Sequence, residues 1–184
     1  MLTSWTVQSI PGLYRVGFPQ HSDTRGTFHK ILANQPQDQL PFRCDQVYWS
    51  RSQTGVARGM HLQLPPFEGR KLVFLTSGRV RDFVLDLRVG SPTYHEMWSD
   101  ELTPESEGIF IPAGCAHGFV TLQGEAAMVY AQEGDHDIDY DSGVNMSGLD
   151  LGCAMETLIF SKRDQMLPMH QEFLSPFTYS DVEL

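Results

Sequence analysis

The stretch KLVFLTSGRVRDFVLDLR, residues 71–88, carries the strongest structural signal in this chain of 184 residues. Alternate residues of its second half would point to opposite faces of a strand, VDVD to one face and RFLL to the other. Both faces mix apolar and charged residues, as expected of a strand in a barrel or a sandwich. The SGR sequence at 77–79 is typical of a hairpin turn. The stretch therefore predicts β structure.

Similar runs of β-branched and aromatic residues recur along the chain, between turns rich in Gly, Pro, Asp and Ser. They cover residues 45–52, 108–114, 117–132 and 155–161. QGE at 123–125 is a second predicted hairpin turn. Short strands at this spacing predict an all-β sandwich or barrel of jelly-roll type.

Helical signals are few. A helical turn is predicted within residues 35–42, and a short helix within 161–173, with Ser161 as N-cap and Asp164 at the third helical position. The chain has no internal repeat and no linker-like segment, so we expect a single domain over residues 1–184.

Charge and cysteine content limit the classes of partner. The formal net charge is −10, which argues against nucleic acid or an anionic membrane as the main partner, because both require a basic surface. A few cations gathered in one cleft would still hold an anionic small molecule. Cys44, Cys115 and Cys153 are odd in number and lack metal-site spacing, which favours free thiols in a reducing cytoplasm. We expect no signal peptide, because the first residues lack a basic segment followed by an apolar one, and no apolar run approaches the roughly 20 residues of a membrane helix.

Two histidines within two residues of a glycine, His61 and His117, lie in segments of barrel character. Either could be a core histidine bonded to a backbone carbonyl. A metal site of the cupin type would need a His-x-His pair, and the sequence HLQ at 61–63 lacks the second histidine. A neutral imidazole is also suited to act as a general base, because its ordinary pKa of about 6.5 lies near working pH. Tyr130 is a candidate acid, or else a core aromatic residue.

Four cations lie near these segments: Arg25, Arg58, Arg70 and Lys71. Most such residues are solvated surface charges. Arg58 stands three residues before His61, and Lys71 opens an apolar strand. Cations set within strands more often face a ligand cavity, where arginine binds phosphate oxygens in a bidentate manner.

In their order along the chain, these motifs resemble those of the dTDP-4-dehydrorhamnose 3,5-epimerase family. The matching motifs are RGMH at 58–61, KLV at 71–73, DLRVGSPT at 86–93, IPAGCAHGF at 111–119 and SKRD at 161–164. The likeness extends from about residue 10 to about residue 170. It implies a cupin-like jelly roll without metal or other cofactor, and a homodimer that exchanges N-terminal strands.

The resemblance also implies an activity: epimerisation at C3 and/or C5 of a nucleotide-linked 4-keto-6-deoxy sugar through an enolate, in the biosynthesis of deoxysugars for cell-surface polysaccharide. His61 stands at the position of the family's catalytic base, and Asp164 at that of the carboxylate that orients the base. Tyr130 stands at the position of the proton donor, and Lys71 at that of the cation that stabilises the enolate oxygen.

Substrate-binding positions follow from the same resemblance. Arg58 and His117 match positions near the sugar and the diphosphate. Arg25 matches a diphosphate contact, and Gln46 matches a contact to the nucleotide-sugar.

The chain departs from the family pattern at three places. Tyr48 replaces a common asparagine and Lys30 a common glutamate, both at expected substrate-binding positions. Two paired aromatic residues are replaced by Asp135 and His136, and Tyr140 is a candidate to compensate for them. The segment 133–141 is acidic, which favours a solvated acidic surface and leaves the sugar and the nucleotide open.

Three other functions remain possible from the sequence. They are a keto-sugar isomerase or dehydratase that uses the same enolate, a sugar-nucleotide-binding relative without activity, and a metal-dependent cupin oxygenase. The intact set of His61, Asp164, Tyr130 and Lys71 argues against the second, and the missing ligand pair argues against the third.

Overall fold

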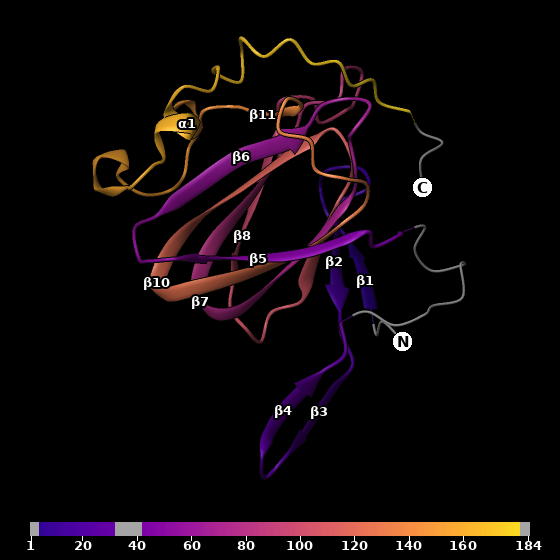
Figure 1. Cartoon of the computed structure of the whole chain (residues 1–184), viewed down its shortest axis with the longest axis vertical. Coiled ribbons are helices and arrows are strands. Elements are labelled where there is room, and N and C mark those ends of the chain that lie inside the picture. Colours follow the sequence, from indigo (N-terminus) through magenta and orange to yellow (C-terminus); the bar gives the residue numbers. More distant parts are fainter. Residues whose placement is uncertain (1–3, 32–41, 181–184) are drawn as a thin grey trace.

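The computed structural model describes residues 4–31 and 42–180, and within these ranges it is almost entirely β structure (Figure 1). The strands are β1 (Ser4–Val7), β2 (Tyr14–Gly17), β3 (Gln20–Asp23), β4 (Gly26–His29), β5 (Gln46–Ser52), β6 (Ala57–Gln63), β7 (Lys71–Asp86), β8 (Met97–Leu102), β9 (Gly108–Ile111), β10 (Cys115–Gln132) and β11 (Asp141–Gly143). The helices are η1 (Met146–Gly148), η2 (Met155–Thr157) and α1 (Lys162–Gln165). The predicted all-β class with a few short helices is confirmed.

One long antiparallel ribbon, β7 with β10, organises the barrel. Its two strands pair from Lys71 opposite Gln132 to Asp86 opposite Cys115. The first part of β7 also pairs with β9, and the last part of β10 with β5. The second part of β7 pairs with β8, and the first part of β10 with β6. The ribbon therefore contributes to both walls of the barrel.

The two predicted hairpin turns are wrong, because the chain bends at these sites without reversing. Residues 77–79 lie inside β7 and residues 123–125 inside β10, where the register between the two strands shifts. Gly78 has φ +77°, and a Cβ atom there would lie 2.8 Å from the Cα of Ala126. The glycine permits a left-handed residue at a close approach of two strands. A local sequence signal for such a residue does not distinguish a bend from a hairpin.

The alternation seen within residues 80–87 is confirmed by the core. Val80 and Val84 belong to the apolar cluster between the two walls, whereas Phe83 and Leu85 belong to a second cluster that includes Phe173. The second cluster forms because the segment after β11 packs across the outer face of the sheet near β6 (Figure 1). Burial on both faces explains why the strand has no polar face, since each large apolar side chain contributes about 1.5–3 kcal/mol when buried.

The hairpin of β3 and β4 forms a separate two-stranded sheet that projects from the body of the molecule (Figure 1). Every residue from 20 to 29 is exposed, including Phe28 at 61%. An exposed hairpin with an exposed aromatic side chain has no core of its own to stabilise it.

The predicted helix within 161–173 is present only as the single turn α1. The Ser161 side chain accepts a hydrogen bond from the backbone N–H of Asp164 at 3.0 Å, as expected of an N-cap. This cap fixes Asp164 in the first turn, where its side chain is buried. The other predicted helical turn, within 35–42, lies almost wholly outside the described residues.

Two other expectations concern cysteines and membranes. Cys44, Cys115 and Cys153 are all free thiols. Within the described ranges, the chain contains no helix with the length and hydropathy needed to span a membrane.

Candidate active site

A cavity of about 280 Å³ lies between the two walls of the barrel. Its lining comes mainly from β5, β6, β7 and β10, with additions from the segment 133–141 and from α1. The lining residues are Tyr48, Ser50, Arg58, His61, Gln63, Lys71, His117, Gly118, Phe119, Tyr130, Gln132, His136, Asp141 and Arg163. The volume is at the lower end for ligand cavities, so it suits a single ring better than a complete sugar nucleotide.

His61 and Asp164 form a hydrogen-bonded pair at the wall of this cavity. The His61 Nε2 and Asp164 Oδ1 atoms lie 2.8 Å apart, and the side chains are 29% and 5% exposed. Burial alone would raise the pKa of Asp164, but the hydrogen bond from His61 and a weaker one from the Gly59 N–H lower it below its usual value. The carboxylate therefore stays ionised and holds Nε2 as the protonated nitrogen. Nδ1 is left with a free lone pair, as a general base requires.

Tyr130 enters the cavity from the other wall, on the last part of β10. Its hydroxyl lies 3.5 Å from Ser50 Oγ, and burial raises its pKa well above its usual value. The phenol therefore keeps its proton at neutral pH and can donate it to a carbanion. Because His61 lies on β6 and Tyr130 on the opposite wall, a ring bound between them would meet the two groups on different faces.

Lys71 begins β7 at one end of the cavity. Burial lowers the pKa of its ammonium to about 8, and the negative charge of Asp141 partly opposes this shift. Below pH 8 the side chain is mostly a poorly solvated cation, which would stabilise a negative oxygen more strongly than a fully hydrated one.

A second imidazole–carboxylate pair stands beside the first. His117 on β10 is the register partner of His61 on β6, and its Nε2 atom lies 2.8 Å from Asp82 Oδ1. The His117 side chain is 5% exposed and that of Asp82 is fully buried. The other Asp82 oxygen, Oδ2, has no hydrogen-bond partner among the described residues.

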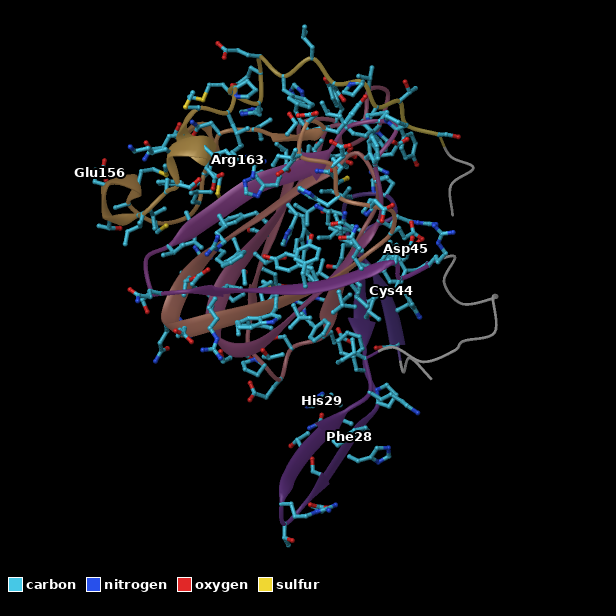
Figure 2. All side chains as sticks on the ribbon, in the orientation of Figure 1. Phe28, His29, Cys44, Asp45, Glu156 and Arg163 are labelled. Atoms are coloured by element: carbon cyan, nitrogen blue, oxygen red, sulfur yellow. The ribbon has the colours of Figure 1, made fainter. Side chains whose placement is uncertain are left out.

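Arg58 and Arg163 place two guanidinium groups at the mouth of the cavity. Arg58 donates to Ser52 Oγ at 2.8 Å and to the Arg51 carbonyl at 3.1 Å. Arg163 lies next to β6 (Figure 2), where its Nη2 atom is 2.7 Å from an Asp141 oxygen. Both arginines are exposed, so the N–H groups not used in these contacts can bind an anion there.

Three expected binding positions do not line this cavity. Arg25 pairs with Asp23 on the β3–β4 hairpin, and Lys30 is exposed just after β4. Figure 2 shows the neighbouring Phe28 and His29 on that hairpin, far from Arg163. Gln46 donates its amide to the Gly134 carbonyl at 2.8 Å.

The acidic segment 133–141 is not one solvated surface. Glu133 pairs with Arg70 through two hydrogen bonds, which also takes Arg70 out of the set of candidate ligand cations. Asp141 and His136 line the cavity, 3.3 Å apart. Asp135 and Asp139 are exposed, as the solvated interpretation predicts.

Tyr140 does not take the place of the aromatic residues that the family pattern has near positions 135 and 136. It packs on Phe67 with ring centroids 4.8 Å apart and lies outside the cavity lining.

Several lining residues escaped the sequence analysis. Gln63 and Gln132 stand two residues after His61 and Tyr130 on the same strands, so period-two alternation could have placed them on the same face. Asp141 and Arg163 come from irregular segments and had no comparable signal. In the part of the chain that the structure describes, no three His, Cys, Asp or Glu side chains gather to hold a metal ion.

Comparison with known proteins gives a consistent result. The sequence profile of the dTDP-4-dehydrorhamnose 3,5-epimerase family matches residues 7–172. The chain belongs to this family. Its fold is therefore the cupin-like jelly roll of these epimerases, which are enzymes of the isomerase class.

Individual relatives agree with this assignment. A dTDP-4-dehydrorhamnose 3,5-epimerase from Sinorhizobium fredii is 36% identical over 135 residues, covering 71% of this chain and 69% of the relative. A dTDP-4-dehydrorhamnose 3-epimerase from Streptomyces niveus is 33% identical over 165 residues, covering 85% and 78%. The crystal structure of a 3,5-epimerase from Legionella pneumophila in complex with dTDP-4-keto-L-rhamnose has a TM-score of 0.88 at 26% identity, covering 96% and 99%.

Proposed function

We propose that this protein is an epimerase that inverts C3, C5 or both in a nucleotide-linked 4-keto-6-deoxy sugar. The observation that carries the proposal is the His61–Asp164 pair, which opens onto a cavity also reached by Tyr130 and Lys71. A 4-keto group acidifies the hydrogens on both neighbouring carbons. A base, an opposed acid and a cation near the oxygen are the groups that such chemistry needs.

The chemistry proceeds in two proton transfers. His61 Nδ1 takes the proton from the carbon next to the ketone, and the C–H electron pair becomes a C=C bond while C4=O becomes an enolate oxygen. Lys71 stabilises that negative oxygen. Tyr130 then delivers a proton to the opposite face of the carbon, and the ketone re-forms with the configuration inverted. Solvent restores the tyrosine proton and removes that of His61.

The charges around the cavity support a diphosphate-linked substrate. Although the whole chain is acidic, Arg58 and Arg163 stand at the mouth and Lys71 lies inside. With the sugar ring in a cavity of about 280 Å³, the diphosphate and nucleoside would lie along the mouth.

We further propose a homodimer, in which the β3–β4 hairpin of one chain packs against the other. The support is the hairpin's isolation from its own barrel and the exposure of Phe28. In such a dimer Arg25, and with it Lys30, would approach the mouth of the partner's cavity. The three free thiols support a cytoplasmic location.

The number of inverted centres is the finer question, because relatives of this chain include both 3,5-epimerases and a 3-epimerase. Proton NMR in D₂O with dTDP-4-keto-6-deoxyglucose answers it. Loss of both H3 and H5 with a new product establishes a double epimerase, and loss of H3 alone a single one. If His61→Ala exchanges as fast as the natural chain, the assignment of the base is wrong. If the natural chain exchanges neither proton, in this sugar nucleotide or in its GDP- and CDP-linked counterparts, the epimerase proposal fails.

A further inference from the structure

Two buried amide groups in the cavity wall each have an unpartnered donor. Gln132 is 1% exposed and Gln63 is 4% exposed. The Gln132 Oε1 atom accepts from the Tyr48 hydroxyl at 2.7 Å, and the Gln63 Oε1 atom accepts from the Asp137 N–H at 2.9 Å. In both residues Nε2 has no partner among the described residues. Buried donors are nearly always paired, so these N–H groups call for an acceptor that the described part of the chain does not supply.

Gln132 is the better placed of the two for chemistry. It lies directly opposite Lys71 in the pairing of β10 with β7, and directly opposite residues of an antiparallel pair project from the same face. Both residues line the cavity. Tyr130 precedes Gln132 by two residues and lies on that face as well. The cation, the amide and the proton donor thus share one wall.

Tyr48 fixes which way this amide points. Its ring stacks on that of Tyr130, with centroids 4.9 Å apart and planes at 11°. Its hydroxyl donates to the Gln132 Oε1 atom, so the NH₂ group of the amide points away from Tyr48. Because burial raises the pKa of Tyr48 to about 12, the hydroxyl stays a donor across the physiological range. An amide held in this way needs no reorganisation when charge develops beside it.

We propose that Gln132, held by Tyr48, donates an N–H to the C4 oxygen that Lys71 faces. This inference rests on the proposed epimerase function. When the base takes the α-proton, the electron pair of the C–H bond moves into the ring and a negative charge develops on C4–O. Lys71 and Gln132 then bind this oxygen together, and the charge returns to carbon when the proton from Tyr130 arrives. Gln132 thus joins Lys71 as a catalytic group at this oxygen, and Tyr48 is a positioning residue.

The rate of deuterium incorporation from solvent, measured against substrate concentration, tests the proposal. Gln132→Met keeps the length of the side chain and removes the donor. We expect its kcat to fall about 100-fold with KM changed less than about threefold, because the bond strengthens mainly in the transition state. Tyr48→Phe keeps the stacked ring and should lower kcat about tenfold. Gln123→Met, at an exposed position of the same strand, is the matched control and should match the natural chain.

Coupling separates positioning from general damage to the wall. If Tyr48 acts only through Gln132, the double variant Tyr48→Phe/Gln132→Met will be no slower than Gln132→Met, within about twofold. If the fold-losses in kcat of the two single variants multiply in the double variant, Tyr48 acts independently of Gln132, through its ring stacked on Tyr130. A kcat of Gln132→Met within twofold of the natural chain, or a change in KM alone, would overturn the catalytic role of the amide.

A spectroscopic signature distinguishes this inference from the epimerase proposal itself. In ¹⁵N-labelled protein, the Gln132 side-chain amide is the resonance that disappears in Gln132→Met. It should shift on addition of dTDP-4-keto-6-deoxyglucose but not of dTDP. A shift with dTDP alone, or no shift with the keto sugar, would overturn the contact. If the natural chain binds the sugar without exchanging deuterium, the epimerase proposal fails, and the catalytic role of Gln132 fails with it. A shift of the Gln132 amide in that case would still show that the amide contacts the sugar.

Discussion

Two histidine–carboxylate pairs stand side by side in this barrel and differ mainly in access to solvent. His61 and His117 are register partners on β6 and β10, and each Nε2 atom lies 2.8 Å from an aspartate oxygen. The His61 side chain is 29% exposed, whereas that of His117 is 5% exposed over a fully buried Asp82. Although both histidines line the cavity, His61–Asp164 is the more exposed, open pair and His117–Asp82 is the almost wholly buried, sealed pair.

The difference shows that a hydrogen-bonded imidazole is not a base by virtue of its partner alone. Its second nitrogen must also reach the atom that loses a proton. Asp164 approaches His61 from α1, outside the wall, so the imidazole ring is left facing the cavity. Asp82 comes from β7 within the same sheet, and the His117–Asp82 pair is packed into the core. The open pair should govern rate and the sealed pair stability.

The largest expected effect is that of His61→Ala. Loss of the base should slow deuterium exchange by about 10³-fold or more, within the range usual for general bases. Stability should change little, because water in the cavity can take the place of the imidazole beside Asp164. Exchange and thermal unfolding measured on the same sample check both parts. A large fall in melting temperature would remove the contrast with the sealed pair.

Asp164→Asn should have a smaller effect on the same reaction. The amide oxygen can still accept from His61 Nε2, but it no longer stabilises the imidazolium that forms when the base takes its proton. We expect kcat to fall about 100-fold with KM nearly unchanged. A change confined to KM would show that Asp164 supports substrate binding instead.

His117→Leu should affect stability most. It leaves the buried Asp82 carboxylate without its partner, which we expect to cost about 3 kcal/mol of unfolding free energy. Chemical denaturation measures this loss. Because two apolar groups leave no unpaired charge, His117→Leu combined with Asp82→Leu should recover part of it. A double variant less stable than the single one would contradict this account of the sealed pair.

The smallest expected effect is a shift in the pH dependence of the exchange rate, which Lys71 and Asp141 control. The pKa of Lys71 is lowered to about 8, so the exchange rate should fall about tenfold per pH unit above that value as the cation loses its proton. Because Asp141 raises this pKa, Asp141→Asn should move the alkaline limb to lower pH. Asp139→Asn, an exposed change in the same segment, should leave it in place. If Asp141→Asn does not move the alkaline limb, the limb reflects the titration of a group other than Lys71.

Several features of the site could be read from the sequence, and the reasons are local. The RGMH motif lies on β6, in a segment of barrel character, and the KLV motif opens β7, which was predicted to be β structure from its composition and its later alternation. The Ser161 cap predicted the short turn that carries Asp164. Gly78 was correctly read as a residue with an unusual backbone conformation, but the predicted hairpin turn is a bend, because β7 continues past it in its pairing with β10.

Other features depend on contacts between distant parts of the chain. No pattern indicated that the charge of Asp141 would raise the pKa of Lys71 against the effect of burial. The two residues are 70 apart in sequence, and only the fold brings β11 and the start of β7 to the same cavity. Nor did any pattern separate His61 from His117, since both lie within two residues of a glycine in a strand-like run.

The sequence by itself determined the all-β class, the strands that carry the reactive groups, and through its motifs the family. Strand periodicity and capping act between near neighbours, so they are readable from order alone. The tertiary structure decided which of the two cavity histidines is the more exposed, that Tyr48 orients Gln132, and that Arg25 lies on a hairpin apart from its own barrel. Burial and hydrogen-bond partners are set by segments far apart in the chain, and these set the chemistry of each side chain.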